Sequence, residues 1–187
     1  MDLQKFGIKL YLETNGSFKS KDFIPVFHNW IQEKVVSDHL LIDVADYSHI
    51  LDGPGVMLIA HEGHFSLDQE KQKPGIMYMR RRNLAGNFKE RFMEVFSIAA
   101  QAANRLTKNS MSKEIYVSAN SFRFIANDRR VAKNTSDNQI AFQDEVQKAL
   151  VEMYPQSKWE CEDVSNENER LAFTVNFNTD INILDKN

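Results

Sequence analysis

The sequence has almost no cysteine, because Cys161 is the only one among 187 residues. A single cysteine cannot form a disulfide within the chain. The first residues, MDLQKFGIKLYLETNG, are interrupted by Asp2, Gln4 and Lys5, and no apolar run follows a basic start. We therefore see no signal peptide. Both observations favour a cytoplasmic location.

Long apolar runs and several nucleotide-binding and catalytic patterns are also missing. No window reaches the roughly 18 consecutive apolar residues of a transmembrane helix, so we expect no membrane partner. The net charge of −3 and the pI of about 6.0 argue against a nucleic-acid partner, and no RRM, KH or zinc-finger pattern occurs. The phosphate-loop pattern GxxxxGK[ST], the dinucleotide pattern GxGxxG and the nucleophile elbow GxSxG do not occur either.

Glycine and proline are scarce, whereas phenylalanine is abundant, with 7, 4 and 13 copies respectively. Hydrophobic residues make up 42% and charged residues 26% of the chain. These values are near the globular average, so the composition excludes an intrinsically disordered chain. The length is typical of one domain, and we predict a single domain over 1–187 with a frayed tail over 178–187.

Apolar periodicity divides the chain into helices and strands. Apolar residues recur every three or four positions in three segments, which predicts helices over 22–36, 87–108 and 137–154. Strands are predicted over 6–13, 39–44, 56–62, 76–82, 114–119, 121–126, 158–163 and 170–177, with a short further strand over 130–132. The predicted order is β-α-β-β-β-α-β-β-(β)-α-β-β. Strands follow one another directly more often than they alternate with helices. This favours an α+β fold with a mainly antiparallel sheet of about seven or eight strands and three helices packed on it.

Three stretches resemble a known set of proteins. They are IPVFHNWIQ (24–32), LLIDVADYSH (40–49) with DGPGVMLIAHE (52–62), and PGIMYMRRR (74–82). Together they resemble a family of uncharacterised bacterial proteins. That family has no known activity, so the resemblance implies a bacterial, cytoplasmic protein and transfers no catalytic residue. It makes 40–62 the most recognisable part of the chain.

The same region is rich in histidine and carboxylate side chains, which are ligands for Zn, Mn or Fe and also serve acid–base chemistry. Within 43–64 they are Asp43, Asp46, His49, Asp52, His61, Glu62 and His64. If 40–44 and 56–61 pair as a hairpin with Val44 opposite Gly55, His39 approaches Ala60. The two ends of that hairpin are then roughly 16 Å apart, too far for one metal ion. The predicted metal ligands are therefore His39, His61, Glu62 and His64.

Two interpretations of this histidine group stay open. In an extended chain Glu62 and His64 share a face and His61 points the other way, although a bulge at Gly63 can re-aim a side chain. The spelling also differs from the helical HExxH zinc motif. One interpretation is a divalent-metal site in a metal-assisted hydrolase or proton-transfer enzyme that uses His61, Glu62 and His64. The other is a polar strand end whose groups are satisfied by backbone and water.

Two further places are candidates for ligand contact. The loop over 46–55 is longer than a hairpin needs, and connecting loops often carry function. Its candidate residues are Asp46, Tyr47, His49 and Asp52, although Asp52 also suits a simple turn. Arg80 and Arg82 share one face of a strand end and are suited to hold a phosphate or carboxylate of a small anionic ligand. A charged strand edge that resists aggregation is the alternative explanation for these arginines.

Charge is unevenly distributed along the chain. Residues 80–108 hold seven Lys and Arg against two Asp and Glu, and residues 156–187 hold three against seven. Opposite charges on two faces steer self-association, which suggests a homodimer. Our leading hypothesis is accordingly a small cytoplasmic binding or interaction module that forms a homo-oligomer, and the enzyme is the alternative.

Overall fold

In the computed structural model the described residues exclude 1, 16–17, 109–114, 164–167, 179–182 and 185–187. The described part contains three α-helices, α1 (Ile24–Glu33), α2 (Phe88–Thr107) and α3 (Ser136–Met153). Its strands are β1 (Phe6–Thr14), β2 (Leu41–Tyr47), β3 (Gly55–Ala60), β4 (Gly63–Asp68), β5 (Gly75–Arg80), β6 (Ile115–Ala126), β7 (Trp159–Asp163) and β8 (Ala172–Phe177). Two short 3-10 turns, Ser20–Phe23 and Glu70–Gln72, complete it.

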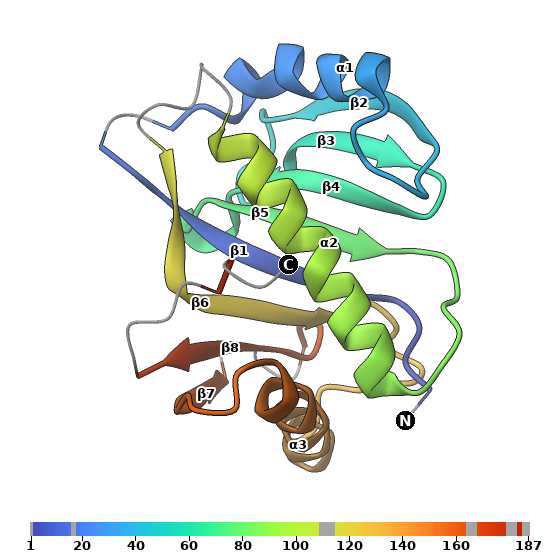
Figure 1. Ribbon diagram of the computed structural model, residues 1–187, viewed down its shortest axis with the longest axis vertical. Coiled ribbons are helices and arrows are strands. Elements are labelled where there is room, and N and C mark those ends of the chain that lie inside the picture. Colours follow the sequence, from blue (N-terminus) through green and yellow to red (C-terminus); the bar gives the residue numbers. More distant parts are fainter. Residues whose placement is uncertain (1, 16–17, 109–114, 164–167, 179–182, 185–187) are drawn as a thin grey trace.

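The strands form one eight-stranded sheet in the order β2-β3-β4-β5-β1-β6-β8-β7, and every neighbouring pair is antiparallel. The helices pack on one face of this sheet, with α1 near β2, α2 across the middle strands and α3 near β8 and β7 (Figure 1). The predicted α+β fold with an antiparallel sheet and three helices is confirmed.

Alternation along the strands decides which side chains enter the core. In β1, Phe6, Ile8 and Leu10 face the helices and are fully buried in the main apolar cluster. Gly7, Lys9 and Tyr11 point to the opposite face, because successive residues of a strand alternate. Aromatic rings from α2 and the sheet interlock across the core, and the Phe96 and Phe122 ring centroids are 5.1 Å apart.

The first turn of α2 is closed by a capping box. The Asn87 side chain accepts a hydrogen bond from the Glu90 amide, and the Glu90 carboxylate accepts one from the Asn87 amide. This reciprocal pair satisfies two amides that a helix start otherwise leaves unpaired. The helix therefore begins at Phe88, in agreement with the predicted segment over 87–108.

Four details of the predicted strand pattern are wrong. β4 was not predicted, and His61 and Glu62 form the two-residue connection between β3 and β4. The two strands predicted over 114–119 and 121–126 are the single strand β6, and the short strand predicted over 130–132 is absent from this described segment. The hairpin register also differs, since Val44 lies opposite Leu58 and Tyr47 lies opposite Gly55.

Only part of the C-terminal segment over 178–187 belongs to the described residues. Within the predicted frayed tail over 178–187, residues 179–182 and 185–187 lie outside the described residues. The Ile183 side chain is buried, and its carbonyl accepts a hydrogen bond from Tyr154 Oη at 2.9 Å. None of the helices in the described part is long and apolar enough to cross a membrane.

Candidate functional site

The sheet face opposite the helices carries buried charges. Lys9 on β1 lies between Met77 on β5 and Arg123 on β6 in the strand register. Lys9 is fully buried and Arg123 is only 6% exposed, although the three described helices all pack on the other face. Charged side chains are rarely buried unless they are paired. The partners of these two cations therefore define the centre of the site.

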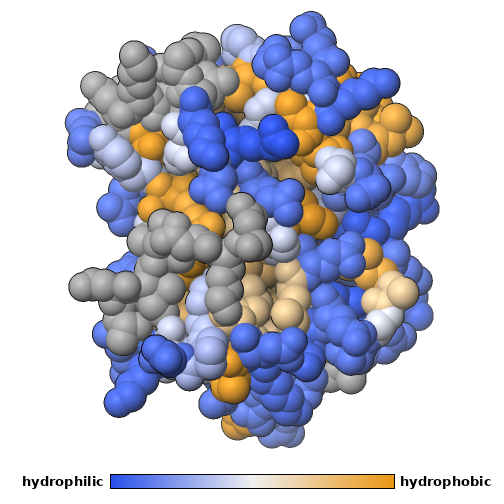
Figure 2. All heavy atoms as spheres, viewed as in Figure 1, coloured by the Kyte–Doolittle hydropathy of each residue, from blue (hydrophilic) through white to orange (hydrophobic). Residues whose placement is uncertain are grey.

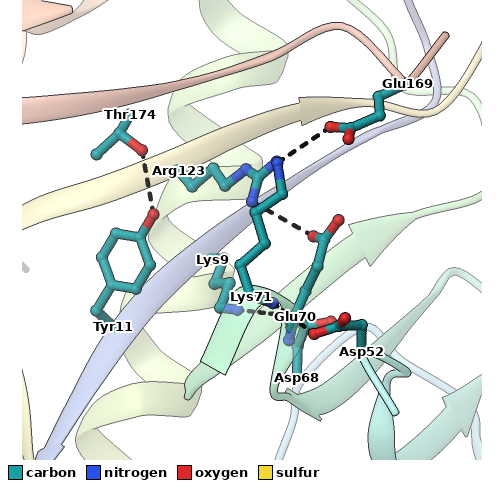
Figure 3. A network of polar contacts seen from close by, with 9 residues as sticks. All are labelled: Lys9, Tyr11, Asp52, Asp68, Glu70, Lys71, Arg123, Glu169 and Thr174. Carbon is teal, nitrogen blue, oxygen red and sulfur yellow. Dashed lines mark hydrogen bonds and ion pairs between the residues drawn. The ribbon is translucent and has the colours of Figure 1, made fainter. Parts of the chain in front are cut away.

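Two carboxylates supply the pairing (Figure 3). Lys9 Nζ donates to Asp68 Oδ1, and the same oxygen accepts a hydrogen bond from the Glu70 amide at 3.2 Å. Arg123 Nη1 lies 3.4 Å from Glu70 Oε2. Because Lys9 and Arg123 are direct cross-strand neighbours of like charge, they repel each other, and the two carboxylates offset this repulsion. We refer to Lys9, Asp68, Glu70 and Arg123 as the buried charge network.

Burial shifts the pKa values in this region. Desolvation lowers the pKa of Lys9 from its ordinary value, and the carboxylates of Asp68 and Glu70 oppose that effect. Burial raises the pKa of the neighbouring Tyr11, whose hydroxyl is 3.1 Å from Thr174 Oγ1. Titratable groups perturbed by burial and by a specific partner mark candidate functional sites when they lie beside a cavity.

The segment over 69–74 covers the buried charge network from the solvent side. Lys71 Nζ is 3.1 Å from Glu169 Oε2, and the Lys71 amide donates to Asp52 Oδ1 at 2.8 Å. Asp52, Lys71 and Gln72 have φ values of 56°, 57° and 57°, in the left-handed region that non-glycine residues rarely adopt. Such strain persists where surrounding contacts hold it in place, and it concentrates at functional sites.

A cavity of about 320 Å³ lies beside the network on this face. Met57, Met77 and Met79 line it, and its polar lining includes Asp52, His64, Asp68, Glu70 and Arg170. A second, smaller cavity of about 150 Å³ shares Glu70 and Arg170 with the first. The two cavities therefore adjoin, and together they border the buried charge network.

His64 presents a neutral imidazole to the larger cavity. Arg81 Nη1 lies 3.1 Å from His64 Nε2. A guanidinium can only donate, so Nε2 of the neutral ring accepts this hydrogen bond. Burial lowers the pKa of His64, and the nearby Arg81 charge lowers it further. Both effects favour the uncharged ring at neutral pH.

The structure does not bring the predicted metal ligands together. His39 is on the helix side, where Nε2 is 2.7 Å from Tyr78 Oη, whereas His64 is on the opposite face. The Glu62 carboxylate accepts a hydrogen bond from the Leu40 amide at 2.8 Å, and His61 is exposed in the turn. Across the described residues, no three His, Cys, Asp or Glu side chains are placed to hold one metal ion. The geometry thus gives the predicted divalent metal no support.

The predicted loop residues divide between two places. Asp46 accepts a hydrogen bond from the Ser48 amide at 2.8 Å, and Tyr47 is 38% exposed. His49 and Asp52 line a cavity of about 370 Å³ between the loop and the segment over 69–74. Asp52 also lines the cavity formed by Met57, Met77 and Met79 (the methionine cavity) on the sheet face opposite the helices (the helix-free face). It is the one of the four predicted loop residues that lines this cavity.

The structure places Arg80 and Arg82, the predicted anion contacts, in different surroundings. Arg80 is buried, its Nε donates to the Arg82 carbonyl at 3.0 Å, and its Nη1 donates to Tyr78 Oη at 3.3 Å. Arg82 is exposed beyond the end of β5. Neither guanidinium group lines either of the two cavities on the helix-free face.

Sequence reasoning did not single out the buried charge network. One signal was present, because Lys9 in FGIKLYLE and Arg123 in SFRFIA are charged residues that alternate with apolar residues of the core face. A charged residue within a strand must point to the face opposite its apolar neighbours. The alternation alone does not reveal that a loop segment buries that face.

The fold and the site together define an α+β protein whose antiparallel sheet is covered by helices on one face and carries a partly covered charged site on the other. No protein-family model, no curated protein and no solved structure matches the chain. The resemblance to uncharacterised bacterial proteins therefore depends only on the segments quoted above.

Proposed function

We propose that the protein is a small-molecule-binding module and that its ligand binds on the helix-free face of the sheet. The observation that supports this most directly is the cavity of about 320 Å³ beside the buried charge network. Buried ion pairs add little net stability, because desolvation offsets their attraction. We therefore attribute the buried charge network to function, because it can hold the residues of a binding site in one geometry. Ligand sites typically combine an apolar lining with a few specifically placed polar groups.

The lining favours an organic ligand with an apolar part. Met57, Met77 and Met79 come from β3 and β5, and their side chains are flexible enough to fit irregular shapes. Asp52, His64 and Arg170 provide polar contacts around them. The cavity volume is at the lower end of the range for ligand pockets, roughly 300–1,000 Å³. We therefore expect a small organic molecule.

Methionine methyl signals provide the test of this proposal. The protein is labelled at the methyl carbon of methionine and titrated with pools of small organic carboxylates, amines and neutral compounds, and NMR spectra are recorded. We expect at least one pool to shift the Met57, Met77 and Met79 signals. Met93 and Met153 pack against the helix-side core and serve as internal controls, so their signals should stay in place.

A variant that fills the cavity sharpens this test. Met57 is half-buried and lines the cavity, so Met57→Trp should occupy the space and abolish the shifts of Met77 and Met79. If every pool leaves all three methionine signals of the cavity unchanged, the helix-free face is not a small-molecule site. Shifts that persist in Met57→Trp would place binding elsewhere.

We also propose a cytoplasmic location, in keeping with the single cysteine. Cys161 is half-buried on β7, and burial raises the pKa of its thiol to about 11. Little of the reactive thiolate therefore forms at neutral pH. A reduced thiol of this kind fits a reducing compartment, where disulfides are rare.

A homodimer is the assembly that we propose. Leu40, just before the edge strand β2, and Ile42, within it, are 64% and 55% exposed. Figure 2 shows apolar side chains on the surface over the end of the molecule where α1 and β2 lie. The Val44 amide on the same strand donates to the Asp43 carboxylate at 2.8 Å, so that amide is not offered for strand pairing. We therefore expect a second copy to pack on the apolar side chains without extending the sheet.

Sedimentation velocity tests the homodimer. The protein should sediment as a dimer at micromolar concentration, and Ile42→Glu should shift it to the monomer because a buried unpaired charge opposes association. The control is Ile140→Glu on α3, where Ile140 is 60% exposed and lies outside this patch. A wild-type monomer, or an Ile42→Glu variant that still dimerises, would rule out this interface.

A further inference from the structure

The smaller cavity on the helix-free face is lined by three arginines from separate parts of the chain. Arg123 is on β6, Arg129 is in the turn after β6, and Arg170 precedes β8. The cavity volume is about 150 Å³, and Glu70 and Glu169 also line it. We propose that this arginine cavity holds the carboxylate of a small organic monocarboxylate. The proposal deepens the function proposed above and rests on it.

The three guanidinium groups have N–H donors that are not used in hydrogen bonds to charged acceptors. Arg123 is 6% exposed, and its Nε has no hydrogen-bond partner among the described residues. Arg170 Nη1 donates to a neutral acceptor, Asn127 Oδ1, at 3.2 Å. Arg129 makes no hydrogen bond or ion pair with any residue that the structure describes. A guanidinium has five N–H donors and matches a carboxylate in shape, so these donors suit an anion that enters the cavity.

The charge balance favours one negative charge on the ligand. Three arginines line the cavity against two glutamates, which leaves an excess of one positive charge. Glu70 faces Arg123 at 3.4 Å, and Glu169 pairs with Lys71 at 3.1 Å. Each glutamate therefore has a cationic partner in the structure. A monoanion matches this excess among the lining residues, and the two carboxylates repel a dianionic phosphate more strongly than they repel a monoanion.

The neighbouring methionine cavity can accommodate an apolar part of the ligand. Ile125 and Ala172 line the arginine cavity and belong to one apolar cluster with Met77 and Met79. The methionine cavity contains Met77 and Met79 and shares Arg170 with the arginine cavity. A ligand whose carboxylate meets the arginines therefore lays its apolar chain over the methionines. This geometry identifies the ligand class as a monocarboxylate with an apolar tail.

Four probes with the same six-carbon chain test the head-group preference. They are hexanoate, hexyl phosphate, hexylamine and hexanol, each titrated into methyl-labelled protein while the Met77 and Met79 signals are followed by NMR. We expect hexanoate to bind about tenfold more tightly than hexanol, because charge-assisted hydrogen bonds strengthen its binding. Hexyl phosphate and hexylamine should both bind more weakly than hexanoate.

Matched arginine variants locate the carboxylate. Arg129→Gln and Arg170→Gln should each weaken hexanoate binding about tenfold and leave hexanol binding unchanged. Arg130→Gln is the control, since Arg130 is exposed in the same turn and lines neither cavity, and it should bind hexanoate like the wild type.

The outcomes separate this inference from the proposed function. If all four probes bind equally, or if Arg129→Gln and Arg170→Gln bind hexanoate like the wild type, the monocarboxylate assignment is wrong while small-molecule binding stands. Tighter binding of hexyl phosphate than of hexanoate would overturn the preference for a single charge. If no probe and no compound pool moves the Met77 and Met79 signals, both proposals fail.

Discussion

Asp68→Ala should lower the free energy of unfolding by about 3–5 kcal/mol, the usual effect of removing one partner of a buried ion pair. The variant leaves the Lys9 ammonium fully buried, without its hydrogen-bond acceptor, and beside the Arg123 cation. Glu70 remains nearby but already faces Arg123 at 3.4 Å. Urea denaturation of the wild type and the variant, analysed by linear extrapolation, measures the difference.

Two further variants distinguish the cost of leaving the Lys9 charge buried and unpaired from the cost of losing any ion pair. Lys9→Met/Asp68→Leu removes both charges and should be far more stable than Asp68→Ala, because replacement of a buried pair by apolar side chains is often neutral or stabilising. Glu152→Gln breaks the exposed Lys89–Glu152 pair and should change the stability very little. An Asp68→Ala variant as stable as Glu152→Gln would show that water or Glu70 fully compensates Lys9.

Much of the architecture was predictable because it depends on short-range patterns. The alternation of Phe6, Ile8 and Leu10 identified β1, and the three-to-four-residue spacing of apolar side chains identified α2. β4 was missed because His61 and Glu62 were assigned to the end of the preceding strand. A two-residue connection leaves too little polar sequence to separate two strands by pattern alone.

The site was less predictable because its residues meet through tertiary structure. Asp52 and His64 were among the sequence candidates, and both line the methionine cavity. His39 and His64 were grouped by their closeness in sequence, but they lie on opposite faces of the sheet. Arg123 and Arg170 belong to segments that meet only when β6 pairs with β8. No spacing rule within one segment predicts such a meeting.

Phe124→Ala should lower the free energy of unfolding by about 3–5 kcal/mol, the range for removal of a large buried aromatic side chain. Phe124 is fully buried on β6, and its ring centroid lies 5.0 Å from that of Phe173 and 5.6 Å from that of Phe6. It also contacts rings from α2 and α3. The truncation leaves a cavity where both helices meet the sheet, and urea denaturation measures its cost.

Phe124 also tests how the core positions the site, because it lies between Arg123 and Ile125, which point to the helix-free face. Under conditions where Phe124→Ala is still folded, a loosened β6 should weaken hexanoate binding, since a site is held in geometry by the packing behind it. Tyr116→Ala is the matched control, because Tyr116 is on the same strand and 53% exposed, and it should affect neither stability nor binding substantially. Wild-type affinity in folded Phe124→Ala would mean that the arginine cavity is held by the segment over 69–74 and its ion pairs, and not by the aromatic core beneath it.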